Sequence, residues 1–499
     1  MTKQTIWKRV VALLAAAALL GAVGCSEDGG SGDRRSNESG EEVLIKVWGL
    51  SDFLKGEESP GQQMIKEFNE KYKGKIRVEG RYMPAAEYNT AIQAAITSRD
   101  LPDIYQTPSG QDIRSFVANG LVLPFDGLVS ESWKNRFLPG SFVEGVNVID
   151  GKTYSWPLTG PQLGAILYYN KDVLKNAGLD AEKPPKTWDE LREMARTVTA
   201  KGRGDVFGVV FGGAESGAVN FVTALAAGVS PADAGGFNYK TGRYSYDSKA
   251  ILDALDVLLR LKQDGSILPS SYMLRGAEAG ILFGQGKAAF LIDGRARMWI
   301  VKRDTPEANF GLAPVPTPNG DKPTFYYVPA NPTGYMISST TKHPKEVGIF
   351  LEHGFTATMF YERYLKSGVA LTPIESINNN RSLYPYPEFD TFMQLHKELL
   401  KLRPDYAVKN PQTAKVIVEL GSLDQPKIKP GFQEILQSVL SGGQKDAAPL
   451  LKAYNDKLNK GLEDAVAKVK ASGVNVSLDD FAFPDWDPRK DHTHYTSRP

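Results

Sequence analysis

The 499-residue chain contains a single cysteine, Cys25. An intrachain disulfide is therefore excluded, and so is a zinc site built on several cysteine thiolates. Histidine is also scarce, with five residues and no His-Glu-x-x-His pair, so no histidine-based metal site and no cofactor are expected. The fold must rest on core packing alone, which a chain of this length allows.

Motifs of common catalytic sites are missing as well. The chain has no Gly-x-Ser-x-Gly elbow and no Gly-x-x-x-x-Gly-Lys-Ser/Thr phosphate loop. A carboxylate pair for glycoside hydrolysis cannot be singled out, because Asp and Glu are common. The sequence therefore favours a protein that is not an enzyme, with an exported lyase or hydrolase as the alternative.

The chain also lacks an excess of positive charge, with 59 Lys and Arg against 58 Asp and Glu. Removal of residues 1–24 would leave 56 basic residues and a net charge near −2. Nucleic acid is not expected as a partner, since phosphate binding needs a basic patch. Apolar residues make up 41% and charged residues 23%, as in ordinary soluble globular proteins.

A leader precedes the cysteine. Three basic residues are followed by an apolar stretch from Val10 to Leu20, which is short for a transmembrane helix, and then by small residues. This order predicts a cleaved signal peptide over residues 1–24. The segment 22–25 (Ala-Val-Gly-Cys) resembles the lipobox of bacterial lipoproteins, so Cys25 is expected to carry a lipid such as palmitate. The alternative is a plain signal peptide with an incidental cysteine.

Residues 25–42 comprise Cys25 and a stretch rich in Ser, Gly, Asp and Glu. Too little apolar surface is present to order such a stretch, so a flexible tether is expected. The mature protein is then extracytoplasmic and anchored to the cell membrane by the lipid on Cys25.

Apolar, β-branched runs alternate with helical patterns at the start of the body. The runs at 43–49, 75–79 and 102–105 predict strands, and the patterns at 64–72 and 86–98 predict helices. Strands that alternate with helices are typical of an α/β layer with parallel pairing.

A second α/β region is expected further along. A strand at 164–169 precedes a helix that begins at a capping box, Thr187 with Glu190, and the period indicates another helix over 250–261. The segment 373–405, rich in Tyr, Pro and Asn, shows no period.

We expect an N-terminal lobe from 43–165 completed by about 310–370, a C-terminal lobe from 166–309, and a mostly helical segment over 371–499.

Aromatic residues stand at several predicted strand ends and in loops, where they could meet a ligand. Ligands of α/β sheets bind beyond the carboxyl ends of the strands. Sugars need flat rings for their C–H faces and polar side chains for their hydroxyls. The alternative for each ring is core packing. The rings concerned are Trp48, Tyr105, Trp156, Trp299 and Tyr335.

Several segments together carry a family resemblance. They include 102–104 (Pro-Asp-Ile), 150–157 (Asp-Gly-Lys-Thr-Tyr-Ser-Trp-Pro), 283–294 (ending Ala-Ala-Phe-Leu-Ile-Asp-Gly) and 310–316 (Phe-Gly-Leu-Ala-Pro-Val-Pro). In order and spacing they resemble family 1 of the extracellular solute-binding proteins of ABC transporters, the family that includes maltose-binding protein. The match extends over about residues 43–339.

The resemblance implies a fold and a function. The fold would be a two-lobed, type II periplasmic-binding-protein-like α/β fold, with a hinged cleft that closes on its ligand. The function would be capture of an oligosaccharide and delivery to the permease subunits of an ABC importer, by a monomer without a cofactor. A peptide or a polyamine is the alternative solute.

The resemblance also points to residues around the cleft. The loop after Pro-Asp-Ile, the segment after Trp156-Pro157 and the turn after Asp293-Gly294 would supply ligand contacts, although Asp293, like Asp103, could instead cap backbone amides. The implied ligand-binding residues are Trp48, Tyr105, Gln106, Ser109, Gln111, Trp156, Gln162, Asp293, Arg295, Trp299 and Tyr335.

Three arginines near this region, Arg114, Arg295 and Arg297, suggest an acidic sugar such as a uronate oligomer. A guanidinium can bind a carboxylate through two parallel hydrogen bonds. The alternative is that these arginines form surface ion pairs.

Overall fold

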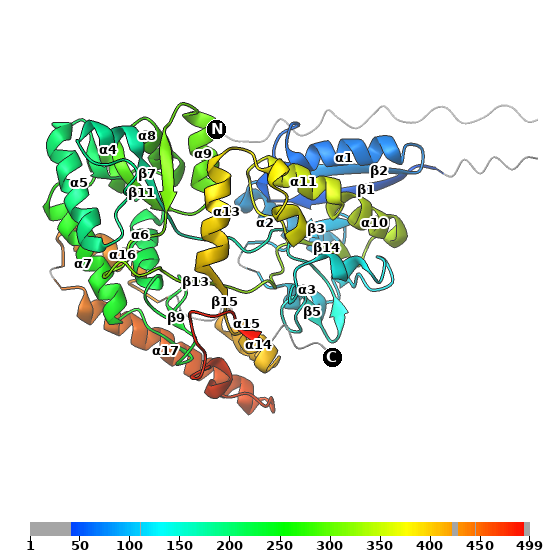
Figure 1. Ribbon diagram of the computed structural model, residues 1–499. Helices are drawn as coiled ribbons and strands as arrows, with labels where there is room; N and C mark the ends of the chain where they lie inside the picture. The colour runs from blue at the N-terminus through cyan, green and yellow to red at the C-terminus, as the bar shows by residue number, and fades with distance from the viewer. Residues whose placement is uncertain (1–40, 110, 422–427, 445, 494–499) are drawn as a thin grey trace, which may run out of the picture. The chain divides into compact units, whose positions relative to one another are not determined.

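The computed structural model describes residues 41–109, 111–421, 428–444 and 446–493. The predicted signal peptide, Cys25 and the tether up to residue 40 lie outside the described residues. All elements below belong to one compact unit, Glu42–Pro499 (Figure 1). Within the described ranges, no helix is both long and apolar enough to cross a membrane.

The first sheet has five strands in the order β2-β1-β3-β14-β4. β1 (Val43–Gly49) is parallel to both β2 (Ile76–Tyr82) and β3 (Ile104–Gln106), which confirms the predicted parallel layer. β14 (Tyr335–Ser338) pairs antiparallel with β3 and with β4 (Val122–Leu123). A later segment of the chain, residues 335–338, thus contributes a strand to the first sheet.

Two helices connect the parallel strands of this sheet. α1 (Pro60–Lys71) begins after Ser59, whose hydroxyl accepts a hydrogen bond from the Gln62 amide, and it buries its apolar face. α2 (Ala85–Ser98) packs in the same way through Tyr88 and Ile92. Both helices lie close to their predicted bounds.

The second sheet has four strands in the order β12-β7-β11-β8. β7 (Ile166–Asn170) pairs antiparallel with β11 (Ala288–Asp293) and with β12 (Phe310–Ala313), whereas β8 (Phe207–Val209) is parallel to β11. The sequence assigned residues from 310 onward to the first lobe. The pairing of β12 with β7 instead places residues 310–313 in the second sheet.

Helices cover the second sheet. α5 (Trp188–Gly202) begins at the predicted capping box, in which Thr187 Oγ1 accepts from the Glu190 amide at 3.0 Å. α7 (Lys249–Gln263) has the predicted period and buries Leu255 and Leu258. α6 (Gly217–Ala227) packs against both α7 and β11. Figure 1 shows these helices in green around β7 and β11.

The C-terminal part is mostly helical, as predicted, and its longest helix is α17 (Ala448–Ala471), drawn in orange-red in Figure 1. α17 is bonded to the hairpin of β9 (Phe237–Asn238) and β10 (Arg243–Tyr244), because Asn459 Oδ1 accepts from the Tyr244 amide at 2.9 Å. It also packs against α15 (Thr413–Leu420).

The segment 373–405, which had no assignment, forms α12 (Glu375–Asn378), α13 (Glu388–Leu399) and β15 (Leu400–Leu402). β15 pairs parallel with β13 (Phe325–Tyr327). Near the end of the described chain, Trp486 is buried. The other helices and strands are α3 (Ile113–Ala118), β5 (Val148–Ile149), β6 (Lys152–Thr153), α4 (Lys171–Asn176), α8 (Gly276–Gly284), α9 (Ala296–Asp304), α10 (Pro344–Phe350), the π-helix η4 (Leu351–Phe355), α11 (Thr358–Lys366), α14 (Tyr406–Lys409) and α16 (Phe432–Ser441). The short 3-10 helices are η1 (Asp52–Leu54), η2 (Trp133–Arg136), η3 (Pro269–Tyr272), η5 (Arg381–Leu383) and η6 (Leu478–Phe481).

Candidate ligand-binding site

The carboxyl ends of the parallel strands lie at one edge of the first sheet. β1 and β3 end together, since Trp48 pairs with Tyr105 in the register of the two strands. β14 runs the other way, so its first residue, Tyr335, lies beside Gln106. The chain that enters β14 therefore reaches the sheet at this same edge.

The second sheet has the same arrangement. β11 ends at Asp293, which lies opposite Ile166, the first residue of β7. The connection from the first lobe, residues 154–165, therefore enters the second sheet at the carboxyl end of β11. β12 leaves the sheet at this edge as well, because Ala313 pairs with Leu167.

Backbone hydrogen bonds tie these connecting segments to one another. The Gly334 amide donates to Trp156 O at 2.7 Å, and the Gly160 amide donates to Leu371 O at 2.9 Å. Ligands of α/β proteins bind beyond the carboxyl ends of the strands. In this protein, the segments that link the two sheets meet at these strand ends. We take these edges as the candidate site.

Gln106 organises the edge of the first sheet from within. Its Oε1 accepts from the amides of Leu50 and Ser51 at 2.9 and 3.0 Å, and its Nε2 donates to Thr333 O at 3.2 Å. The side chain is buried, and its hydrogen bonds are made inside the protein. Gln106 therefore positions the loop after β1 and is not a free ligand contact.

Three of the predicted aromatic contacts lie in the core, each with an exposed fraction of 0%: Tyr105, Trp156 and Tyr335. The Tyr105 hydroxyl donates to Leu121 O at 3.0 Å, and Trp156 Nε1 donates to the Tyr361 hydroxyl at 3.1 Å. β3 and β14 are inner strands of the sheet, so a ring on them is covered by protein. These three residues do not belong to the candidate site.

Arg295 is also buried, with an exposed fraction of 4%, so it is not in a surface ion pair. Its Nε donates to Gln162 Oε1 at 2.5 Å, and its Nη1 donates to Gly368 O. Burial lowers the pKa of this guanidinium. Arg295 thus joins Gln162 of the connecting segment to the turn after β11 and is not free to contact a ligand, whereas Gln162 is half-buried.

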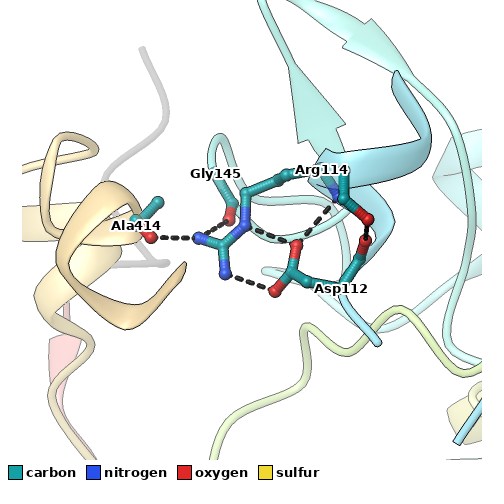
Figure 2. Close-up of polar contacts among 5 residues, drawn as sticks. Asp112, Arg114, Gly145 and Ala414 are labelled. Atoms are coloured by element: carbon teal, nitrogen blue, oxygen red, sulfur yellow. Dashed lines mark hydrogen bonds and ion pairs between the residues drawn. The ribbon is translucent and has the colours of Figure 1, made fainter. Parts of the chain in front are cut away.

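Arg114 is bound in another part of the fold. Figure 2 shows its guanidinium between the carboxylate of Asp112 and the carbonyl oxygens of Gly145 and Ala414. Ala414 belongs to α15, so Arg114 links the first lobe to the C-terminal helices. Arg114 is therefore not available as a ligand contact.

A polar cluster remains at the carboxyl edge of the second sheet, formed by Asp293, Arg297, Glu215 and Gly276. Arg297 Nε donates to Asp293 Oδ2 at 2.9 Å, and the Gly276 amide donates to Glu215 Oε2 at 2.9 Å. A Cβ on Gly276 would lie only 2.4 Å from Arg297 Nη2, so glycine allows the guanidinium to approach the start of α8. The cluster offers donors and acceptors in one place.

Sequence reasoning identified Asp293 and Arg297 of this cluster but missed Glu215 and Gly276. Neither missed residue carries a sequence signal, since a single Glu and a single Gly are common in loops. Contacts among the segments that follow β8 and β11 and the start of α8 bring the four residues together. In the described parts of the chain, no group of three or more His, Cys, Asp or Glu side chains is placed to hold a metal ion.

The other predicted contacts are at least partly accessible. Trp48 is half-buried, and the Arg81 guanidinium lies 5.6 Å from its ring centroid. Ser109 and Gln111 are exposed in the loop after β3. Trp299 is half-buried on α9, where the Arg303 guanidinium lies 4.4 Å from its ring centroid.

Comparison with known proteins identifies relatives of this chain. The profile of the bacterial extracellular solute-binding protein family matches residues 55–358. A binding protein of Brucella abortus (strain 2308) is 24% identical over 367 residues, which is 71% of this chain and 76% of that protein. The sn-glycerol-3-phosphate-binding periplasmic protein UgpB of the same organism is 35% identical over 147 residues, which is 28% of this chain and 33% of UgpB.

Among solved structures, the maltose/maltodextrin-binding domain MalE from Bdellovibrio bacteriovorus bound to maltotriose is similar in fold. It has a TM-score of 0.56 and 22% identity, and the match covers 83% of this chain and 99% of that domain. The fold is therefore the predicted two-lobed α/β fold of type II binding proteins. Since the family profile matches more than half of its length, the chain belongs to the bacterial extracellular solute-binding proteins, and it is an extracytoplasmic solute-binding protein of the kind that serves ABC transporters, not an enzyme.

Proposed function

We propose that the protein binds an oligosaccharide between the carboxyl edges of its two sheets and delivers it to an ABC importer. The observation that supports this most strongly is that the connecting segments join the two sheets at these edges. A ligand that contacts both edges favours the arrangement in which they are close, so binding and lobe closure are coupled.

The accessible side chains at the edges suit a sugar. Asp293 and Glu215 can accept hydrogen bonds from hydroxyls, and Arg297 can donate to them. Trp48 on the first sheet offers part of a ring for an apolar sugar face. The similarity in fold to a protein solved with maltotriose agrees with this class of ligand.

The proposal can be tested by thermal unfolding of the mature protein with maltotriose, raffinose, xylotriose and glucose. A ligand at about 100 times its Kd should stabilise the protein by about 2.7 kcal/mol. Arg297→Gln should weaken binding, whereas Arg303→Gln, a matched change on the same helix, should not. The absence of stabilisation by every oligosaccharide would argue against the proposal.

A phosphorylated polyol is a second candidate ligand. The partial similarity to UgpB favours an anion, and Arg297, which donates to Asp293, is the cation of the cluster that would bind it. sn-Glycerol 3-phosphate therefore belongs in the same experiment. If only sn-glycerol 3-phosphate stabilises the protein, the ligand is a phosphorylated polyol. A uronate trisaccharide in the same experiment tests whether the oligosaccharide is acidic.

We further propose that a lipid on Cys25 anchors the protein to the cell membrane and that it acts as a monomer. The lipobox resemblance supports the anchor, although Cys25 lies outside the described residues. Cys25→Ser should move the protein from the membrane fraction to the soluble fraction of expressing cells. An unchanged distribution, or a wild-type mass without lipid, would contradict the anchor.

A further inference from the structure

Two exposed apolar side chains lie next to each other in the second lobe. Tyr272 has an exposed fraction of 37% and Met273 of 79%. Six large apolar side chains are exposed in the described part of the chain, and Tyr272 and Met273 are the only two of them that are consecutive in sequence. The pair therefore differs from the scattered apolar residues that every protein surface carries.

Backbone hydrogen bonds fix the position of this pair. The Gly213 amide donates to Ser271 O at 2.7 Å, and the Ala214 amide donates to Leu274 O at 3.0 Å. Gly213 and Ala214 follow the carboxyl end of β8, so the loop that carries Tyr272 and Met273 lies beyond that strand. A Cβ on Gly213 would be 2.8 Å from the Tyr272 Cα, which explains the need for glycine at this contact.

The Tyr272 ring is held by Phe211, with the ring centroids 5.5 Å apart and the planes at 88°. One part of the ring is thus packed, and the rest stays accessible. The neighbours of the loop include the polar cluster, because Ala214 precedes Glu215 and Leu274 lies two residues before Gly276. An apolar surface and a polar surface therefore lie side by side at the end of β8.

We propose that one ring of the oligosaccharide binds at the polar cluster. The C–H face of the adjacent ring then packs on an apolar platform formed by Tyr272 and Met273. This inference rests on the proposed function and names the residues that would contact a second ring of the oligosaccharide. A tyrosine ring provides flat apolar area with little loss of side-chain freedom. A methionine side chain adapts its shape to different rings.

The experiment uses the mature protein labelled at the methionine methyl groups, with maltotriose, raffinose, xylotriose and glucose as probes. The Met273 resonance is assigned by its loss in Met273→Leu, and Met359, which is 60% exposed on α11, is the reference. We expect an oligosaccharide to shift the Met273 resonance and not the Met359 resonance. This measurement does not depend on the stability of any platform variant.

Affinities of variants provide the second arm. Tyr272→Ala and Met273→Ala should each weaken the best oligosaccharide by about tenfold and change glucose binding little, whereas Tyr272→Phe and Met359→Ala should bind like the wild type. If an oligosaccharide binds without shifting the Met273 resonance and with equal affinity for all variants, the platform is overturned, whereas the proposed function stands. If the Tyr272→Ala and Met273→Ala variants bind the oligosaccharide normally but cells that carry them no longer take it up, the pair contacts the permease and the platform is overturned. If the wild-type protein binds no sugar, both proposals are overturned.

Discussion

Arg295 shows how a residue at a predicted ligand position can serve the fold instead. Its hydrogen-bond acceptors are both neutral: Gln162 Oε1 lies in the segment that connects the two sheets, and Gly368 O lies just after α11. Truncation would leave the buried Gly368 carbonyl and the half-buried Gln162 amide oxygen without their donor, which costs more than the hydrogen bonds themselves contribute.

We expect Arg295→Ala to lower the free energy of unfolding by about 3 kcal/mol, because two hydrogen bonds to a charged donor are lost. Urea unfolding followed by circular dichroism measures this change. Arg303→Ala, which removes a more exposed guanidinium from α9, should stay within about 1 kcal/mol of the wild type. A wild-type unfolding midpoint for Arg295→Ala would show that the buried contacts contribute nothing.

His396 on α13 is half-buried, with its Nδ1 atom shielded from solvent, and it makes stability depend on pH. Burial lowers the pKa of its imidazole from 6.5 to about 4. In the unfolded chain the group binds a proton below about pH 6.5, and in the folded chain only below about pH 4. Its contribution to stability is therefore complete above pH 6.5 and is lost as the pH falls toward 4, by up to about 3 kcal/mol.

His396→Leu should remove this dependence. We expect the difference in unfolding free energy between wild type and variant to change steadily between pH 7 and pH 4, measured by urea titrations at each pH. His353→Gln, a change at an exposed histidine, should leave the wild-type slope nearly intact. Parallel pH profiles for the wild type and His396→Leu would contradict a buried neutral imidazole.

At the scale of elements, the start of α5 depends on its capping box. Thr187 Oγ1 accepts from the Glu190 amide at 3.0 Å, and Glu190 Oε2 accepts from the Lys186 and Thr187 amides at 2.7 and 3.0 Å. These backbone hydrogen bonds lower the pKa of Glu190. Thr187→Ala should destabilise the protein by about 1 kcal/mol, seen as a lower midpoint in thermal or urea unfolding.

Thr187→Ser keeps the hydroxyl and should behave like the wild type. A loss of stability in the serine variant equal to that in the alanine variant would mean that the threonine methyl group, and not the cap, carries the effect. The sequence predicted this element correctly because a capping box is a local signal that needs no tertiary partner.

Across the whole molecule, the C-terminal helices are bonded to both lobes. Arg243 Nη1 and Glu463 Oε1 of α17 are 2.7 Å apart at the β9–β10 hairpin, and Arg114 from the first lobe donates to Ala414 O of α15 (Figure 2). Gly145 lies against the same helix, since a Cβ there would be 2.7 Å from the Ala414 Cβ. α15 therefore depends on contacts made by the first lobe.

Arg114→Ala should loosen α15 against the first lobe. We expect amide hydrogen exchange in Thr413–Leu420 to accelerate by about tenfold, and exchange in α7, which is remote in sequence and packs against α5 and α6, to stay unchanged. Hydrogen exchange with mass spectrometry measures both segments in one experiment. Arg77→Ala, which removes a surface ion pair with Glu79, is the control, and equal exchange in all three proteins would refute the role of Arg114.

The sequence alone determined the features that depend on local patterns or on composition. Strands β1 to β3, the helices α2, α5 and α7 and the capping box follow from periodicity and from short-range hydrogen bonds. Only the tertiary structure decided which side chains face a ligand. A ring at a strand end or in a loop is buried or exposed according to the strands and segments around it, so Tyr105 of β3 and Trp156 of a loop both lie in the core. Glu215, Gly276 and Tyr272 instead meet beyond the end of β8 through contacts between segments far apart in the chain.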